Sequence, residues 1–168
     1  MNGGMRHMAD PPMLTPDLLL RFPGDTVPTQ PDLLEAMAKR LQAAGAVDER
    51  FLPALLEREA NYPTGLPTEG IGFAIPHADA GLALRSAMCV ALLSEPVAFH
   101  RMDCPEEQVS VQVVVMLALA NPDQQAQVLG SITRSFEDAR FWRSLVESPL
   151  SHEDLVSRIK GRMMPEES

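Results

Sequence analysis

The pattern of apolar and polar residues predicts helices at both ends of the chain and strands between them. Continuous apolar runs of strand length occupy residues 71–75, 87–93 and 109–120, and residues 97–99 extend the second run after a proline. The many β-branched residues of the last run favour a central strand. Apolar residues recur at helical spacing in the flanking segments. This arrangement predicts an α/β or α+β fold, with helices covering a sheet.

Capping residues predict where the helices begin. Thr29 or Gln30 should precede the first helix, because Pro31 suits a first helical turn. Asn121 should cap the helix that follows the last strand, since Pro122 comes next. The other expected elements are helices that start at Asp48, Asp138 and Ser151, a loop over 62–70, and a short strand or a turn of helix within 14–22.

Length and composition predict one soluble domain. The chain has 168 residues, of which 45% are hydrophobic and 22% charged, and these values are ordinary for a globular protein. We expect a single domain over 14–162, a disordered segment over 1–13 and a charged tail over 163–168. No apolar run is long enough to span a bilayer, and residues 1–12 lack the apolar core of a secretory signal. The expected location is therefore the cytoplasm.

Charge and missing motifs narrow the possible functions. A net charge of -9 argues against binding to nucleic acid and to anionic membrane surfaces. The sequence contains no P-loop, dinucleotide fingerprint, nucleophile elbow or zinc-binding helix motif. The spacing of His77, Asp79, His100 and Cys104 matches no familiar set of metal ligands. We therefore expect neither a cofactor nor a metal.

The candidate chemistry lies in the segment 70–79, where a buried strand stops at a proline. Pro76 has no N–H for strand pairing, so the strand should end there, and His77 follows at once. Neutral imidazole is a nucleophile at physiological pH, and strand ends are where α/β folds place their chemistry. From these residues alone, His77 is either the reactive residue or a structural histidine in a turn.

Other polar residues are suited to complete an anion site around His77. Arg58 and Glu59 lie near the end of a predicted helix, Thr64 lies in the turn before the strand, and Gln125 opens a later helix. Arginine pairs with phosphoryl groups through two hydrogen bonds, and helix N-termini favour anions. These are the parts needed to hold a phosphohistidine. Because no ATP site is visible, the phosphoryl group would come from another phosphoprotein.

Three motifs carry a family resemblance: Arg-Glu at 58–59, Pro-Thr-Gly at 63–65, and Gly-Phe-Ala-Ile-Pro-His-Ala at 72–78. In this order and spacing they resemble enzyme IIA of the bacterial phosphoenolpyruvate-dependent sugar phosphotransferase system, fructose/mannitol superfamily. The resemblance implies a mixed central sheet of about five strands with helices on both faces. It also implies that His77 receives a phosphoryl group from phospho-HPr and passes it to an enzyme IIB, which serves the membrane component IIC.

One position departs from the fructose and mannitol pattern. Those members carry a second active-site histidine where this chain has Gln125, and Asn-Pro-Asp-Gln-Gln at 121–125 is similar to the galactitol-specific branch. Glutamine donates a hydrogen bond but carries no charge. The resemblance implies that His77 is the acceptor, that Arg58 contacts the phosphate, and that Gln125 lines the site. Thr64 would donate its hydroxyl to the phosphoryl group or to His77. Glu59 would orient Arg58 or cap the loop, and Asp79 would orient the ring of His77 or cap its own loop.

The resemblance favours a phosphocarrier for a galactitol-like sugar or polyol uptake system, and two alternatives stay open. Nitrogen-type relatives of the same fold are phosphorylated at the same histidine, but they regulate potassium transport or transcription through protein contacts. The other alternative is a binding domain that has kept the fold without the chemistry. The intact His77, Arg58 and Thr64 argue against that second alternative.

Overall fold

A computed structural model describes residues 13–24 and 26–163 of the chain. Apart from Met13 and Met163, the expected disordered segment and the charged tail lie outside the described residues. The elements are the 3-10 helices η1 (Pro16–Leu18) and η2 (Ala80–Leu82), the strands β1 (Leu19–Phe22), β2 (Gly65–Leu66), β3 (Gly72–Ala74), β4 (Ala87–His100) and β5 (Gln108–Ala118), and the helices α2 (Gln30–Ala43), α3 (Phe51–Asn61), α4 (Pro122–Ser135), α5 (Ala139–Val146) and α6 (His152–Met163).

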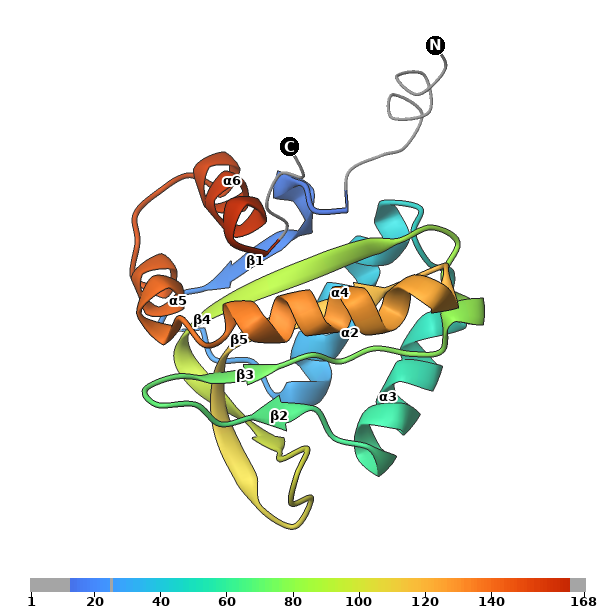
Figure 1. Cartoon of the computed structure of the whole chain (residues 1–168), viewed down its shortest axis with the longest axis horizontal. Coiled ribbons are helices and arrows are strands. Elements are labelled where there is room, and N and C mark those ends of the chain that lie inside the picture. Colours follow the sequence, from blue (N-terminus) through green and yellow to red (C-terminus); the bar gives the residue numbers. More distant parts are fainter. Residues whose placement is uncertain (1–12, 25, 164–168) are drawn as a thin grey trace.

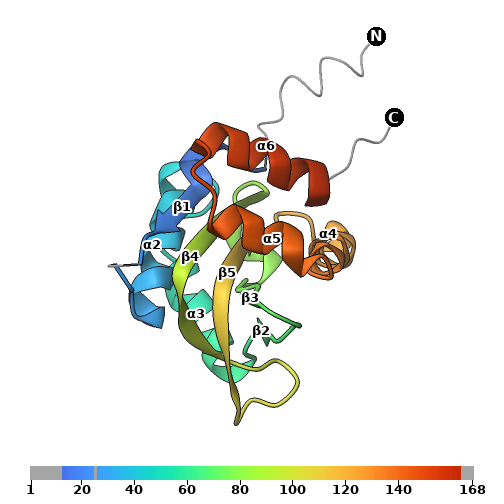
Figure 2. The same ribbon diagram turned by 90° about the vertical axis from the view of Figure 1, so that its left-hand side faces the viewer.

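The strands form one mixed sheet of 5 strands in the order β1-β4-β5-β3-β2. β1 runs parallel to β4, and β3 runs parallel to β5, whereas the pairs β4–β5 and β2–β3 are antiparallel. Helix α4 crosses in front of the sheet and α2 lies behind it (Figure 1). In the view turned by 90°, the sheet lies between α2 and α4 (Figure 2). The predicted class, a mixed sheet with helices on both faces, is confirmed.

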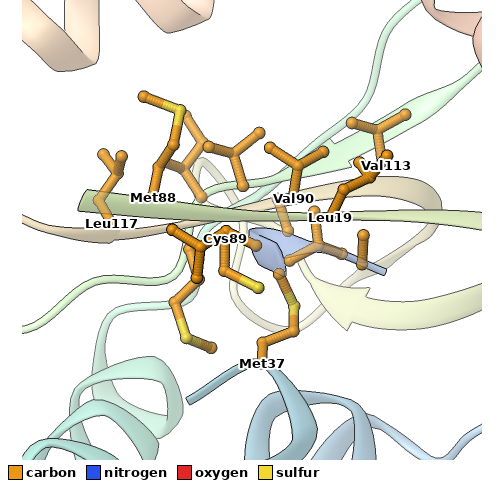
Figure 3. Close-up of a cluster of buried hydrophobic side chains, with 14 of the residues drawn as sticks. Leu19, Met37, Met88, Cys89, Val90, Val113 and Leu117 are labelled. Carbon is orange, nitrogen blue, oxygen red and sulfur yellow. The ribbon is translucent and has the colours of Figure 1, made fainter. Parts of the chain in front are cut away.

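Both faces of the central strands are buried, which explains their continuous apolar runs. Figure 3 shows Met88 and Val90 on one side of β4 and Cys89 on the other, where Met37 of α2 reaches the sheet. All four side chains are fully buried. Among the described residues, no helix combines the length and the apolar character that crossing a membrane requires.

Several predicted strand boundaries differ from the structure, because strand pairing depends on distant residues. The runs at 87–93 and 97–99 belong to one strand, β4, whose register against β5 shifts between Leu92 and Val97. The expected loop over 62–70 contains β2, whose 2 residues are too few to show a periodic pattern. The strand expected over 71–75 is shorter and covers only β3.

The predicted helix starts are mostly confirmed, and one is wrong. The side chains of Thr29, Asn121, Asp138 and Ser151 each accept a hydrogen bond from a backbone N–H in the first turn of the following helix. Helix α3 begins at Phe51 rather than at the predicted Asp48. The Asp48 carboxylate instead accepts hydrogen bonds from the backbone and the guanidinium of Arg50, in a turn before the helix. The segment 14–22 holds both a turn of helix, η1, and a strand, β1.

The parallel pair β3–β5 places His77 at the edge of the sheet where the carboxyl ends of these two strands lie. The backbone N–H of Leu117, near the end of β5, donates to the Pro76 carbonyl at 3.0 Å. His77 forms an isolated parallel bridge with the same Leu117. Because α4 begins 4 residues after Ala118, its first turn starts close to this edge. The topology therefore places a strand-end histidine beside the connection between β5 and α4.

Candidate functional site

The ring of His77 is held by the carbonyl of a residue two positions earlier. Its Nδ1 lies 2.8 Å from the Ile75 carbonyl oxygen. A carbonyl oxygen can only accept a hydrogen bond, so Nδ1 carries the proton and donates it. In the neutral ring, Nε2 then keeps its lone pair. The geometry therefore leaves Nε2 as the ring nitrogen with an available lone pair.

The surroundings of His77 favour the neutral ring. Burial lowers the pKa of His77 below its ordinary value, because the cation is poorly solvated there. The positive charge of Arg58 lowers this pKa further, whereas the bond to Ile75 and the negative charge of Asp79 act in the opposite direction. The lowered pKa therefore favours the uncharged ring at neutral pH.

Glu59 and Thr64 form the buried part of the site, with exposed fractions of 7% and 3%. The Thr64 hydroxyl donates to Glu59 Oε1 at 2.9 Å, and the Thr64 backbone N–H donates to Glu59 Oε2 at 2.9 Å. The Ile75 N–H donates to the Thr64 hydroxyl oxygen at 3.2 Å. Burial raises the pKa of Glu59, although the two bonds from Thr64 oppose that shift. Glu59 thus caps the turn before the His77 strand.

Arg58, Tyr62 and Asp79 form the open part of the site. Arg58 Nη1 lies 3.4 Å from Asp79 Oδ1, and the two side chains are 37% and 83% exposed. The guanidinium also lies over the ring of Tyr62, with 5.7 Å between its carbon and the ring centroid. Within the described part of the chain, Arg58 Nε is buried and has no hydrogen-bond partner. The described residues therefore supply no acceptor for one N–H of the Arg58 guanidinium.

A pocket of about 270 Å³ lies at this open part, and His77 itself does not line it. It is lined by residues of α3, among them Arg58, by Tyr62 at the end of that helix, and by Ala78, Asp79 and Leu82 from the segment after the histidine. A larger hollow, of about 740 Å³, lies between the β2–β3 turn and the α4–α5 connection, and none of the predicted site residues lines it. We place the site beside the smaller pocket, because Arg58 and Asp79 line it and the residue after His77 forms part of its wall.

Gln125 lies on α4 and does not contact His77 through a hydrogen bond in the described residues. Its side chain is half-buried on the helix that starts beside the histidine. Within residues 13–24 and 26–163, no group of three His, Cys, Asp or Glu residues is placed to hold a metal ion. The structure therefore brings Arg58, Glu59, Thr64 and His77 together and places Gln125 on the neighbouring helix.

Sequence reasoning missed one contributor to the site, the Ile75 carbonyl, and gave no role to another, Tyr62. The Ile75 carbonyl orients the histidine ring, but a backbone group leaves no signature in the sequence, because any residue could supply it. Tyr62 contacts Arg58, and the aromatic residue before Pro-Thr-Gly was its available signal. The Asp79 carboxylate meets the guanidinium of Arg58 rather than a nitrogen of the His77 ring.

The sequence model of the family described as "Phosphoenolpyruvate-dependent sugar phosphotransferase system, EIIA 2" matches residues 15–160. The chain belongs to this family. It is an EIIA phosphocarrier domain, a protein that transfers a phosphoryl group by way of a phosphohistidine. The predicted membership of the fructose/mannitol superfamily is thereby confirmed.

Two curated relatives agree with this assignment, and one solved structure shares the fold. The galactitol-specific EIIA component of Escherichia coli K12 is 30% identical over 118 residues, which are 70% of this chain and 78% of that protein. The 2-O-alpha-mannosyl-D-glycerate-specific EIIABC component of the same strain is 32% identical over 146 residues, or 82% of this chain. This chain spans only 21% of the length of that relative.

The solved structure is that of E. coli enzyme IIAMtl in complex with phosphorylated enzyme IIBMtl. It superimposes with a TM-score of 0.69 and 22% sequence identity, and the match covers 89% of this chain and 98% of that one. At this identity the likeness shows a shared fold.

Proposed function

We propose that His77 accepts the phosphoryl group on Nε2. The observation that carries this proposal is the contact of 2.8 Å between Nδ1 and the Ile75 carbonyl, which leaves Nε2 free. In the transfer, the Nε2 lone pair forms the new N–P bond. The N–P bond of the donor phosphohistidine breaks, and its electron pair stays on the donor ring. The proton on Nδ1 remains bonded to the Ile75 carbonyl throughout.

Arg58 is the residue that contacts the phosphoryl oxygens in this proposal. Its pair with Asp79, at 3.4 Å, is longer than the 2.7–2.9 Å typical of a charge-assisted hydrogen bond. The Arg58 side chain is 37% exposed, so a phosphoryl oxygen can reach the guanidinium. Gln125 is the proposed lining residue on α4, and it contributes hydrogen bonds without charge.

The proposed donor is phospho-HPr and the proposed acceptor is an enzyme IIB, which hands the group on to a sugar at a membrane IIC component. Family membership supports this relay, as does the complex of IIAMtl with phosphorylated IIBMtl. We also propose that the domain spans 14–162 and acts in the cytoplasm. The match over residues 15–160 supports the domain bounds.

The substrate of the uptake system is proposed to be a galactitol-like sugar or polyol. The support is the relationship to galactitol-specific EIIA, together with Gln125 where fructose- and mannitol-type members carry histidine. Transfer from this chain to a galactitol-type IIB, compared with a mannitol-type IIB, would test the assignment. Equal or faster transfer to the mannitol-type protein would contradict it.

The decisive experiment incubates the protein with phosphoenolpyruvate, enzyme I and HPr, and reads phosphorylation by intact mass. We expect one acid-labile phosphoryl group on the wild type and none on His77→Ala. The matched control is His152→Ala, because His152 is an exposed histidine on α6. If the wild type stays unmodified in a mixture that charges an authentic EIIA, the proposal fails. If the wild type is charged but passes nothing to any IIB, the regulatory alternative replaces the relay.

A further inference from the structure

A continuous series of hydrogen bonds joins a buried carboxylate to the backbone that holds His77. We propose that Glu59 and Thr64 are positioning residues, which act through the backbone of Ile75 to keep His77 in the tautomer with its proton on Nδ1. This inference rests on the proposed function, because it takes His77 as the phosphoryl acceptor. It gives Thr64 a task that differs from donating its hydroxyl to the phosphoryl group.

The direction of each hydrogen bond in the series is determined by chemistry. The Thr64 backbone N–H donates to one oxygen of Glu59 and the Thr64 hydroxyl gives its one hydrogen to the other, both at 2.9 Å, which is the arrangement that an ionised carboxylate accepts. The oxygen of the same hydroxyl then accepts the Ile75 N–H, at 3.2 Å. The Thr64 hydrogen is therefore already used, which leaves none for a phosphoryl oxygen.

Ile75 connects Thr64 to the histidine, because hydrogen bonds on both sides fix the position of its backbone. It follows directly after β3, so its N–H bonds to Thr64 instead of to a neighbouring strand. The next residue, Pro76, accepts the Leu117 N–H through its carbonyl at 3.0 Å. Between these two anchors, the Ile75 carbonyl faces His77 Nδ1 at 2.8 Å. A fixed acceptor at this place favours the tautomer that has a proton on Nδ1.

Burial makes the series sensitive to single changes. Glu59 and Thr64 are almost inaccessible to solvent, so water does not readily replace a lost partner. An amide at position 59 presents an NH2 group where one oxygen now accepts. One of the two donors of Thr64 then faces another donor, and the hydroxyl loses its defined direction.

The test compares Thr64→Val, which has nearly the same shape but no hydroxyl, with Thr64→Ser, which keeps the hydroxyl. Glu59→Gln removes the charge of the acceptor without changing its shape. The matched control is Thr133→Val, since the Thr133 hydroxyl bonds only to carbonyls of its own helix, α4, away from the site. The first measurement is the tautomer of His77 in the unphosphorylated protein, from the nitrogen chemical shifts of the ring.

We expect Nδ1–H in the wild type, Thr64→Ser and Thr133→Val, and a larger share of Nε2–H in Thr64→Val and Glu59→Gln. The second measurement is steady-state phosphorylation by phospho-HPr. There, kcat should fall by up to about 100-fold in Thr64→Val and Glu59→Gln with little change in KM, because the nucleophile is misplaced while docking is preserved. Thr64→Ser should restore kcat.

Wild-type tautomer and wild-type kcat in both Thr64→Val and Glu59→Gln would overturn the inference. So would unfolding of both variants while Thr133→Val stays folded, since that result assigns the series to stability alone. The outcomes separate the two proposals. A wild type that takes no phosphate refutes the proposed function, whereas phosphorylation of His77 with an unchanged tautomer and rate in the variants refutes only the positioning roles.

Discussion

The buried half of the site (Glu59 and Thr64) and the open half (Arg58, Tyr62 and Asp79) differ in how many of their hydrogen-bond donors and acceptors have partners. In the buried half, Glu59 and Thr64 accept and donate within the protein, and both bond at close to 2.9 Å. In the open half, Arg58 has one long contact with Asp79 and a donor without a partner among the described residues. The side chains that hold the histidine are thus saturated, and the side chain that would bind an anion keeps unused capacity. Changes in the open half should therefore affect phosphoryl transfer with little effect on stability, whereas changes in the buried half should affect both.

The largest expected effect comes from the open half. Arg58→Gln should slow phosphoryl transfer to His77 by about 100-fold or more, because a charged donor to the phosphoryl oxygens is lost. The free energy of unfolding should change by less than about 0.5 kcal/mol, since the ion pair with Asp79 is exposed and long. Transfer kinetics and urea denaturation measure the two effects. Arg58→Lys keeps the charge but not the planar guanidinium, so its rate of phosphoryl transfer should fall between those of the wild type and Arg58→Gln. A large loss of stability in Arg58→Gln would remove the contrast between the halves.

The next effect comes from the buried half and acts on stability. Thr64→Val should lower the free energy of unfolding by about 1–3 kcal/mol, because the Ile75 N–H and the Glu59 carboxylate each lose a buried partner. Urea denaturation measures this change, and Thr64→Ser should stay near the wild type. If Thr64→Val were as stable as the wild type, the hydrogen bonds of the buried half would not differ in importance from those of the open half.

The pKa of His77 depends both on burial and on the charge of Arg58 in the open half. Its pKa in the folded protein should lie below the ordinary value of 6.5, mainly because the ring is buried. The neutral, reactive form should therefore persist as the pH falls through 6.5, and phosphorylation should decline only at lower pH. Arg58→Gln should raise this pKa relative to the wild type, because one positive charge is removed while burial remains. Titration of the His77 ring by NMR measures both. A pKa that falls in Arg58→Gln would contradict the electrostatic account.

The smallest effect is expected for Asp79→Asn. The exposed pair with Arg58 should contribute less than about 0.5 kcal/mol to stability. Because the charge of Asp79 raises the pKa of His77, its removal should move that pKa further down. Thermal unfolding and ring titration measure the two changes. A strong loss of phosphorylation would show that Asp79 belongs to the catalytic arrangement rather than to its rim.

Local signals in the sequence predicted much of the fold. Thr29 and Asn121 cap their helices as expected, because capping depends only on residues within one turn. Pro76 ends the strand before His77, since a missing N–H acts at its own position. The buried strands were found through their apolar runs. Strand β2 was missed, because its 2 residues are strand only by pairing with β3.

Some features of the site likewise follow from the local sequence, and others from tertiary packing. The sequence by itself named the side chains that we propose for the chemistry, His77 and Arg58 above all, because their residue types and the strand–proline–histidine order are local properties. Only the tertiary structure decided that the Thr64 hydroxyl turns to Glu59, that the Ile75 carbonyl meets His77, and that Arg58 is left partly unpaired. These contacts depend on how α3, β3 and β5 pack together, and packing joins residues that no short-range pattern connects.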